Sequence, residues 1–440
     1  MKASYYNVLT ENPLGEGYLL YNTLSKSLCE LDKNEKRLYE RIAMGDGDDY
    51  PLAADLADSG FVLENPDSEA AFLEYQYDRY KFNTQVLELV LATTLDCNNR
   101  CVYCYETPRP GYMHEEVQDA VFGFVREKYE EAPFKKLKVT WQGGEPLLRM
   151  DVIERLSHLF IGFCDEHGVE YIGHVISNGR LATEENAKKL AELRVYSVMT
   201  SLDGSPERHD CRRCTRSGEP SCAKIMANFD NLLSEGIAVN ASFILERNNF
   251  EEFHEIGNEL LEKPGMLVRN TQLRNYRDSY EGDDKNRIDL TTRPEYSDES
   301  FRFFMEQNPS AEELSEALNP IPTFCGTPLH NWWAIDELGN VYKCSGEYGD
   351  DSRVIFNLME PEETRAVNWE LLTQYMTYSP LKDEYCRKCS VLPLCQGECA
   401  FEHIIFGRFC RTFLYNIQDY VQAYYTALVN ESEQQKGEAR

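Results

Sequence analysis

The sequence lacks any long apolar run. None of its hydrophobic stretches approaches the roughly 18 consecutive apolar residues that indicate a membrane-spanning helix. The start of the chain also lacks the apolar core of a secretory signal peptide. We therefore expect a cytoplasmic protein without a membrane partner. Its 440 residues, 42% of them hydrophobic, suffice for two or three domains at about 150 residues each.

Basic residues are scarce relative to acidic ones. The chain has 45 Lys and Arg against 75 Asp and Glu, a formal net charge of −30 at pH 7. Because such a surface repels phosphate groups, we expect no nucleic-acid partner. It would attract a cationic peptide or protein, although acidity also simply keeps many proteins soluble.

Cysteine is the residue type that is abundant. The chain has 15 cysteines, an odd number without a secretory signal, so a disulfide framework is not expected. Three of them fall within residues 97–104 and seven within residues 325–410. Reduced thiols grouped in this way usually bind metals.

Strand-like and helix-like segments alternate through the middle of the chain. Strands are expected at residues 87–95, 137–142, 171–177, 195–202, 237–245 and 266–273, and helices at 114–131, 150–166, 183–193, 221–235 and 250–262. This order predicts right-handed βαβ units and a parallel sheet. Six such strands form a partial (β/α)6 barrel, in which the loops after the strands carry the chemistry.

Polar or glycine-rich motifs follow the first four of these strands. Because the carboxyl ends of parallel strands meet at one edge, the motifs predict a single active site. They are the loop Asp96–Cys104, then Gly143-Gly144-Glu145-Pro146, Ser177-Asn178-Gly179 and Ser201-Leu202-Asp203-Gly204.

The first loop has metal-ligand spacing. Cys97, Cys101 and Cys104 form C-x3-C-x2-C, and three thiolates can bind three irons of a 4Fe–4S cluster. The fourth iron is then left for a small ligand with adjacent amino and carboxylate groups. A fragment of a zinc site is the alternative, but zinc sites prefer paired C-x2-4-C units.

With Tyr103 before its last cysteine, this loop resembles the signature of radical S-adenosylmethionine (SAM) enzymes. The resemblance implies a catalytic cluster on Cys97, Cys101 and Cys104 that binds SAM. It also implies that the other motifs contact the methionine amino group, the ribose and the methionine carboxylate, although each motif alone could be an ordinary turn. The implied SAM-binding residues are Tyr103, Gly143, Gly144, Glu145, Ser177, Asn178, Asp203 and Arg213.

The C-terminal cysteines resemble the SPASM extension of radical SAM enzymes, which holds auxiliary iron–sulfur clusters. The resemblance implies an outer 4Fe–4S cluster on Cys386, Cys389, Cys395 and Cys410, and an inner one on Cys325, Cys344 and Cys399. Seven thiolates cannot complete two such clusters, so one inner corner is left for a substrate atom, a water or another side chain. A zinc ribbon is the alternative for the C-x2-C-x5-C-x3-C part.

The N-terminal segment predicts a small winged-helix-like unit. Its expected elements are strands at 5–10 and 17–24, helices at 34–44 and 51–58, and a short strand at 61–64. It resembles the peptide-recognition domain of many maturases of ribosomally made peptides. That resemblance implies a leader peptide that adds a strand to the sheet edge and buries side chains against the helix. A DNA-binding winged helix is disfavoured by the acidic charge.

We therefore predict three domains: a peptide-recognition domain at 1–85, a radical SAM partial barrel at 86–310 and a SPASM domain at 311–440. The resemblance implies reductive cleavage of SAM and a thioether, carbon–carbon or carbon–oxygen crosslink in a precursor peptide. Three 4Fe–4S clusters and an external electron donor such as flavodoxin or ferredoxin would take part.

Other functions remain open. Anaerobic sulfatase-maturing enzymes, which oxidise Cys or Ser to formylglycine, place an acidic base directly after the cysteine that matches Cys344. Here that residue is Ser345, although Glu347, Asp350 or Asp351 could supply a base. A non-catalytic iron–sulfur electron carrier and a zinc-scaffolded peptide-binding adaptor are the alternatives from other classes.

Five cysteines lie outside these groups. Cys29 and Cys164 are in apolar-periodic segments and are expected in the core. Cys211, Cys214 and Cys222 are expected to be surface thiols in an arginine-rich loop, with a metal or redox role as the alternative.

Overall fold

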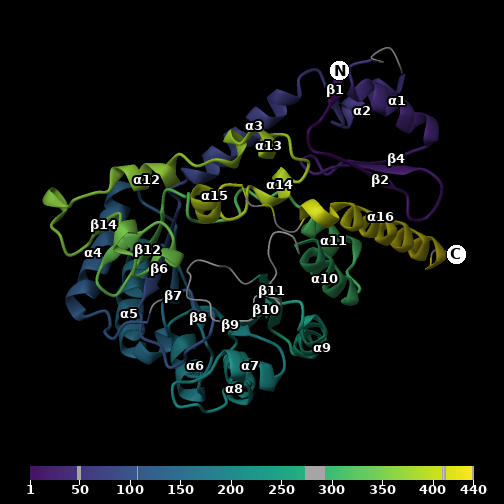
Figure 1. Cartoon of the computed structure of the whole chain (residues 1–440). Helices are drawn as coiled ribbons and strands as arrows, with labels where there is room; N and C mark the ends of the chain where they lie inside the picture. The colour runs from purple at the N-terminus through teal and green to yellow at the C-terminus, as the bar shows by residue number, and fades with distance from the viewer. Residues whose placement is uncertain (47–50, 107, 273–292, 409, 411–412, 439–440) are drawn as a thin grey trace. The chain divides into compact units, whose positions relative to one another are not determined.

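A computed structural model describes residues 1–46, 51–106, 108–272, 293–408, 410 and 413–438 (Figure 1). The chain forms two compact units, each assembled from separate stretches. One unit comprises Met1–Phe82, Leu290–Gly326 and Thr377–Arg440, and the other comprises Asn83–Asp289 and Thr327–Met376. The three contiguous domains of the sequence analysis stay a prediction.

The second unit is built on a nine-stranded sheet. Its strand order is β11-β10-β9-β8-β7-β6-β12-β13-β14, and the first six of these strands are mutually parallel. They are β6 (Val86–Ala92), β7 (Lys136–Gln142), β8 (Glu170–Ser177), β9 (Val195–Leu202), β10 (Ala238–Leu245) and β11 (Met266–Gln272). The predicted α/β fold with a parallel sheet, consistent with a partial barrel, is therefore confirmed.

Helices connect these strands, as expected for βαβ units. They are α4 (Glu115–Glu131), α5 (Met150–His167), α6 (Glu184–Glu192), α7 (Pro206–Arg212), α8 (Cys222–Ser234) and α9 (Phe250–Leu261). In Figure 1 they lie along the outer side of the curved sheet. Helix α7 was not predicted. Helix α12 (Trp369–Met376) and the short helices η1 (Pro146–Arg149), η3 (Ser345–Glu347), η4 (Asp351–Arg353) and η5 (Glu362–Thr364) complete the unit.

Strand β7 shows why the two faces of the sheet differ. Leu137, Val139 and Trp141 are fully buried, whereas the alternate residues are partly exposed, because successive side chains of a strand point to opposite faces. The Trp141 ring stacks on Phe160 of α5, with centroids 6.4 Å apart, so the buried face is the one that contacts the helices. The other face carries polar side chains, including the ion pair of Lys138 with Glu88 on β6 at 3.1 Å.

Three further strands extend this sheet beyond β6, and the sequence analysis did not predict them. Strand β12 (Trp332–Ile335) runs parallel to β6, and β13 (Asn340–Tyr342) and β14 (Phe356–Asn357) follow as antiparallel neighbours. The chain that precedes Cys344 therefore belongs to the same sheet as the three-cysteine loop.

Arg109 fastens the β12–β13 turn to the segment that follows the three-cysteine loop. Its Nε–H donates to Glu337 Oε1 at 2.6 Å, and an NH2 hydrogen is donated to Asp336 Oδ2 at 3.1 Å. Asp336 and Glu337 are 0% and 2% exposed. Asp336 also accepts the backbone N–H groups of Leu338 and Asn340, which closes the turn. One guanidinium thus pairs with two buried carboxylates.

The first unit contains a three-stranded antiparallel sheet of β2 (Asn7–Glu11), β3 (Tyr18–Asn22) and β4 (Leu28–Leu31). Strands β2 and β3 match the prediction, whereas β4 was missed. One face of this sheet packs on α1 (Lys33–Ala43) and α2 (Pro51–Asp58), where Leu20 and Leu31 contact Tyr39, Ile42 and Leu56. Helix α1 begins at a capping box of Asp32 and Glu35, which satisfies its first backbone N–H groups.

The other face of the three-stranded sheet is covered by the C-terminal helix α16 (Phe413–Glu438). Val8, Leu19 and Tyr21 of the sheet share one core with Ile417 and Val421 of this helix. A sheet with both faces covered is not a free-standing winged helix, and the winged-helix interpretation stays a prediction. The other elements of this unit are β1 (Lys2–Ala3), β5 (Val62–Leu63), α3 (Pro66–Lys81), α10 (Arg293–Glu306), α11 (Ala311–Ala317), η6 (Pro380–Lys382), α13 (Glu384–Arg387), α14 (Leu392–Cys395) and α15 (Ala400–Phe406).

The cysteines outside the two groups lie in different environments. Cys164 is fully buried in α5, and Cys29 is partly buried against the α1–α2 core. Cys211 is exposed, as expected. The expectation for Cys222 was wrong: it is only 4% exposed, because α8 begins there and turns this side chain inward.

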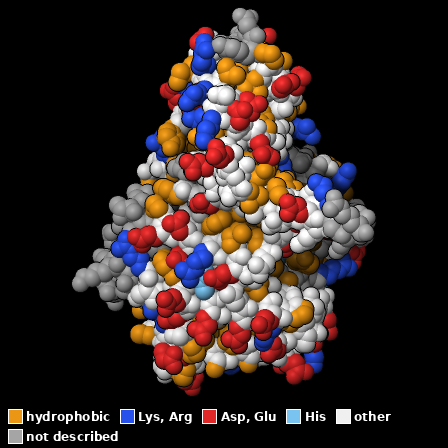
Figure 2. Space-filling view, turned by 90° about the vertical axis from the view of Figure 1, so that its right-hand side faces the viewer, with side chains coloured by type: hydrophobic (Ala, Val, Ile, Leu, Met, Phe, Trp, Pro, Cys, Tyr) orange, Lys and Arg blue, Asp and Glu red, His pale blue; other side chains and the backbone are white. Residues whose placement is uncertain are grey.

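Among the helices that the structure describes, none combines the length and the apolar character that crossing a membrane requires. Figure 2 shows Asp and Glu side chains spread over one face of the molecule, with Lys and Arg between them, in keeping with the negative net charge.

We expect Arg109→Ala to lower the free energy of unfolding by about 2 kcal/mol, because the buried Glu337 loses the one cation that pairs with it among the described residues. The double variant Arg109→Ala/Glu337→Gln should recover part of this loss, since an amide leaves no uncompensated charge. Urea unfolding followed by circular dichroism measures both values. Equal losses in the single and double variants would contradict the role of this ion pair.

Candidate active site

The three-cysteine loop follows β6 and brings its thiols close together. Cys97 and Cys101 are both partly buried. Burial raises the pKa of the Cys97 thiol to about 12, with contributions from the Glu145 carboxylate and from the thiols of Cys101 and Cys104. Burial also raises the pKa of Cys101, and the Arg213 guanidinium opposes this shift. The loop therefore holds three thiols beside one buried cation.

A second segment, which follows α7, holds this loop in shape. The backbone N–H groups of Arg100 and Val102 donate to the carbonyl oxygens of Cys214 and Arg212 at 2.8 and 3.0 Å. Arg216 donates its backbone N–H to Asn98 at 3.1 Å. Sequence reasoning considered Cys214 only as a thiol and gave Thr215 and Arg216 no role, because a backbone contact leaves no side-chain signature.

The two glycines after β7 allow a very close backbone approach to the start of this loop. A Cβ on Gly143 would lie 2.3 Å from the Thr94 carbonyl oxygen, and one on Gly144 would lie 2.3 Å from that of Asp96. Gly143 also has a φ of +118°, which L-residues rarely adopt. The N–H of Glu145 donates to Asp96 at 2.9 Å. Both glycines are therefore required to place the second motif against the residue before Cys97.

Glu145 is fully buried and joins the second and third motifs. Its carboxylate accepts the Ser177 hydroxyl at 2.8 Å, the Asn178 backbone N–H at 2.8 Å and the Leu147 N–H at 3.0 Å. Burial raises the pKa of Glu145, and these three donors oppose that shift. The Asn178 amide also donates to Asn98 at 2.7 Å, which ties the third motif to the cysteine loop.

The fourth motif meets the cysteine loop through Tyr103. Its hydroxyl donates to Asp203 Oδ1 at 2.6 Å and accepts from the Arg213 guanidinium at 2.6 Å. Arg212 donates to Asp203 Oδ2 at 3.0 Å and also pairs with Glu246 at 2.9 Å. Sequence reasoning missed Arg212 and Glu246, although Arg212 adjoins the predicted Arg213. The structure thus brings together residues that the sequence analysis predicted to bind SAM, and that role stays a prediction.

The first unit gathers the four cysteines of the predicted outer cluster. Burial raises the pKa of Cys386 to about 12, with contributions from the nearby Cys410 and Cys389 thiols. The pKa of Cys395 is also raised, mainly by burial, with Cys389 and Cys386 among its neighbours. These thiols therefore lie near one another within the first unit, and the outer cluster stays a prediction.

Two further potential metal ligands adjoin this group. One donor atom each from Asp383, Cys386 and His403 lies within 4.8 Å of the other two. His403 Nδ1 also forms a hydrogen bond of 2.9 Å with the Tyr378 hydroxyl. Of the predicted ligands of the inner cluster, Cys325 and Cys399 belong to this unit and Cys344 belongs to the other. The ligand set of the inner cluster therefore stays a prediction.

Glu347 is the candidate base named for the sulfatase-maturing alternative. It is 2% exposed, and its Oε1 accepts from Arg353 Nε at 2.6 Å and from the Tyr375 hydroxyl at 2.6 Å. Burial raises the pKa of Glu347, and the two donors oppose that shift. Its carboxylate is therefore engaged in a buried ion pair that fixes the loop after Cys344.

Sequence comparison places residues 91–260 in the Radical SAM superfamily model. Among curated relatives, the chain is 30% identical over 187 residues to a probable GTP 3′,8-cyclase of Methanopyrus kandleri, covering 42% of this chain and 56% of the relative. It is 24% identical to a serine-type anaerobic sulfatase-maturating enzyme of Bacteroides thetaiotaomicron, covering 69% of this chain and 80% of that enzyme. It is 22% identical to the radical SAM cyclopropyl synthase TigE of Paramaledivibacter caminithermalis, covering 57% of this chain and 58% of that enzyme. The chain thus spans little more than half the length of the first and third of these relatives.

Two groups of solved structures share the fold. Native anSMEcpe with bound AdoMet and Kp18Cys peptide matches with a TM-score of 0.59 at 19% identity, covering 78% of this chain and 99% of that one. Streptococcus suis SuiB bound to precursor peptide SuiA matches with a TM-score of 0.51 at 15% identity, covering 94% of this chain and 99% of that one. The matched family model contains the three-cysteine loop and the three motifs that hydrogen bonds join to it. The chain therefore carries a domain of the radical SAM superfamily at residues 91–260.

Proposed function

We propose that this protein is a peptide maturase that cleaves SAM reductively and installs a crosslink in a ribosomally made precursor peptide. The observation that carries the proposal is the set of hydrogen bonds that joins four strand ends around Cys97, Cys101 and Cys104. A three-thiol loop leaves one iron of a 4Fe–4S cluster for a second ligand, which is what SAM binding requires. The cluster and SAM would supply the radical chemistry. The protein would bind and orient SAM and the peptide, and it would exclude water.

The SAM contacts follow from the donors and acceptors that remain. A carboxylate has about four acceptor positions, and Glu145 uses three, so one is left for the methionine amino group. The Nε–H of Arg213 is buried without a partner among the described residues, which suits the methionine carboxylate. The closely approached backbone of Gly143 and Gly144 would lie along the amino acid part of SAM.

A peptide substrate is supported by the comparisons. SuiB was crystallised with its precursor peptide and anSMEcpe with a peptide, and both folds match this chain. The negative net charge favours a cationic peptide. We assign residues 1–85 to peptide recognition and the C-terminal cysteines to two auxiliary 4Fe–4S clusters, with an external protein such as flavodoxin or ferredoxin as electron donor.

Formylglycine formation is the second candidate, because the chain matches 80% of a sulfatase-maturating enzyme. The residue directly after Cys344 is Ser345 rather than an acid, and Glu347 is held by Arg353 and Tyr375. Neither residue can readily take a proton from a substrate carbon. This arrangement favours the crosslinking reaction.

Replacing Cys97, Cys101 and Cys104 together by Ala should abolish formation of 5′-deoxyadenosine from SAM and dithionite, while the auxiliary clusters remain. Anaerobic chromatography measures the nucleoside, and iron analysis measures the clusters. Cys211→Ala is the matched control, because this exposed thiol lies on the neighbouring helix α7. Cleavage that persists in the triple variant would refute the assignment of the SAM-binding cluster.

Gly144→Ala should weaken SAM binding about ten-fold or more, since its methyl group would collide with the Asp96 carbonyl and displace the loop. Gly162→Ala makes the same chemical change in α5, where nothing lies within 4 Å of the added carbon. Equilibrium dialysis of reconstituted protein measures the affinity. If both variants bind SAM like the native protein, the close approach at Gly144 has no role in the site.

The crosslinking product can be separated from formylglycine by its chemistry. A crosslink removes two hydrogen atoms: one passes to the deoxyadenosyl radical, and the other leaves as a proton while an auxiliary cluster accepts the electron. Formylglycine is an aldehyde and reacts with hydroxylamine, whereas a crosslink does not. We expect a candidate precursor encoded beside the gene to lose two hydrogens per turnover, by mass spectrometry, without reacting with hydroxylamine. An aldehyde product would favour the second candidate.

A further inference from the structure

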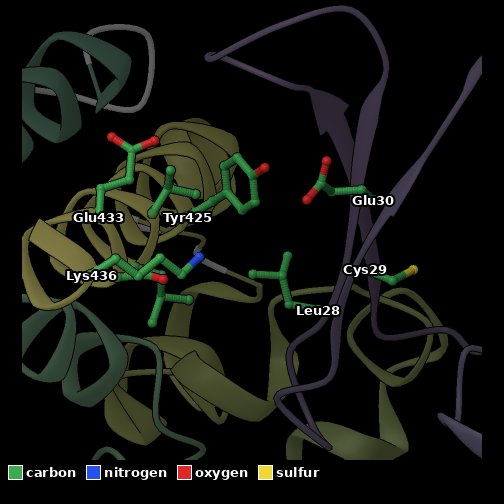
Figure 3. Close-up of a pocket in the computed structure, with 9 residues that line it drawn as sticks. Leu28, Cys29, Glu30, Tyr425, Glu433 and Lys436 are labelled. Carbon is green, nitrogen blue, oxygen red and sulfur yellow. The ribbon is translucent and has the colours of Figure 1, made fainter. Parts of the chain in front are cut away.

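The thiols of the first unit differ in what surrounds them. Cys29 lies at a groove of about 360 Å³ between strand β4 and helix α16, together with Glu30 (Figure 3). Its side chain points to the other side of the strand, so the thiol offers the groove no ligand. At a second place, donor atoms of Asp383, Cys386 and His403 lie within 4.8 Å of one another. There a thiol meets both a carboxylate and an imidazole.

Asp383 is held so that one of its carboxylate oxygens faces His403. It is the residue before α13, and its Oδ1 accepts the backbone N–H groups of Tyr385 and Cys386 at 2.8 and 3.2 Å, which caps this helix. Arg408 donates to the same oxygen at 3.4 Å. Its Oδ2 lies 3.8 Å from His403 Nε2. Helix capping therefore fixes a carboxylate next to the Cys386 thiol and beside the imidazole.

The other ring nitrogen of His403 is held by Tyr378. The side chain of His403 is 12% exposed, and its Nδ1 lies 2.9 Å from the Tyr378 hydroxyl oxygen. Among the described residues, this hydroxyl has no second hydrogen-bond partner. A phenol has one hydrogen to donate, and the Asp383 carboxylate beside Nε2 can only accept. Both contacts are satisfied when Nδ1 accepts from Tyr378 and Nε2 carries the ring hydrogen.

The turn between Cys395 and Cys399 keeps Tyr378 in place. Gly397 in this turn has a φ of +73°, and a Cβ there would lie 2.7 Å from the Tyr378 hydroxyl oxygen. A side chain at Gly397 would therefore displace the hydroxyl. The turn that carries a predicted cluster ligand at each end thus packs directly on the residue that orients His403.

A buried donor next to Cys395 supports a bound group with acceptor atoms at this place. Gln396 is 2% exposed, and its Nε2 is buried without a hydrogen-bond partner among the described residues. Burying an amide donor without an acceptor is costly, and the sulfur atoms of a cluster would accept from it. The residues around Cys386 and Cys395 therefore fit the predicted outer cluster.

We propose that His403 raises the reduction potential of the outer cluster by presenting its Nε2–H to the Cys386 thiolate and the Asp383 carboxylate. Reduction adds a negative charge to the cluster, so an N–H dipole beside one of its ligands stabilises the reduced state more than the oxidised state. The same N–H screens the Asp383 carboxylate, whose charge opposes reduction. The inference rests on the proposed function, in which an auxiliary cluster accepts an electron, and His403 is a positioning residue that favours this transfer through Cys386.

The test is an anaerobic redox titration of the full-length, reconstituted chain with Cys97, Cys101 and Cys104 replaced by Ala, so that electron paramagnetic resonance reports the auxiliary clusters. Adding His403→Leu should shift one midpoint potential to a more negative value and leave the iron and sulfide content unchanged. His403→Gln should recover most of this shift, because its amide N–H can take the place of the Nε2–H. His158→Leu is the matched control, since it makes the same change at an exposed position of α5 in the other unit.

Three further variants in the same background identify the cluster and the contact. Cys386→Ala should remove the signal that His403→Leu shifts, which assigns that signal to the outer cluster. Tyr378→Phe should shift the same potential in the same direction, because Nδ1 loses the donor that keeps the ring hydrogen on Nε2. Tyr77→Phe removes a buried hydroxyl that has no partner in the described part of the chain, and it should leave the potential unchanged.

Each other outcome overturns a defined part of the argument. Equal potentials in His403→Leu and His158→Leu would overturn the role of His403. Loss of iron in His403→Leu would also overturn it, because His403 would then be a ligand of the metal. If the reconstituted triple variant holds no iron–sulfur cluster, the proposed auxiliary clusters fail and this inference fails with them. If the native chain forms no 5′-deoxyadenosine but the potential shifts as expected, the proposed function fails and the role of His403 stands.

Discussion

The buried carboxylate of Glu145 is the interaction on which the candidate active site depends. It accepts hydrogen bonds from Ser177 and Asn178 of the third motif, and its own backbone N–H donates to the carbonyl oxygen of Asp96, the residue before Cys97. A buried charge without such partners would be strongly destabilising, so the loops have to converge on it. The same convergence leaves one acceptor position open. The Glu145 carboxylate thus holds the loops together and also keeps one acceptor position for a ligand.

Two ion pairs of Arg109 connect the segment after the cysteine loop to the β12–β13 turn of the same sheet. Arg109 pairs with Asp336 and Glu337 in the β12–β13 turn, and the chain then reaches Cys344 two residues after β13. The residues around the three-cysteine loop and those around Cys344 therefore share one rigid sheet.

In the first unit, an N-terminal sheet and a C-terminal helix pack against each other. The three-stranded sheet is too small to bury both of its faces, so α1 and α2 cover one face and α16 covers the other. Covering both faces still leaves the β4 edge open. An open edge is a liability in most proteins and a binding site in some.

The amino-acid sequence by itself determined the parallel sheet, its connecting helices and the motifs at the strand ends, because hydrophobic periodicity and cysteine spacing are local signals. It could not reveal β12, Arg212 or the partners of Arg109, since these depend on contacts between residues far apart in the chain. Cys222 was misplaced for the same reason: α8 starts at that residue, and only packing decides which way it faces. The tertiary structure also decided that α16 walls the β4 edge, because a helix more than 380 residues away leaves no trace in the pattern of β4.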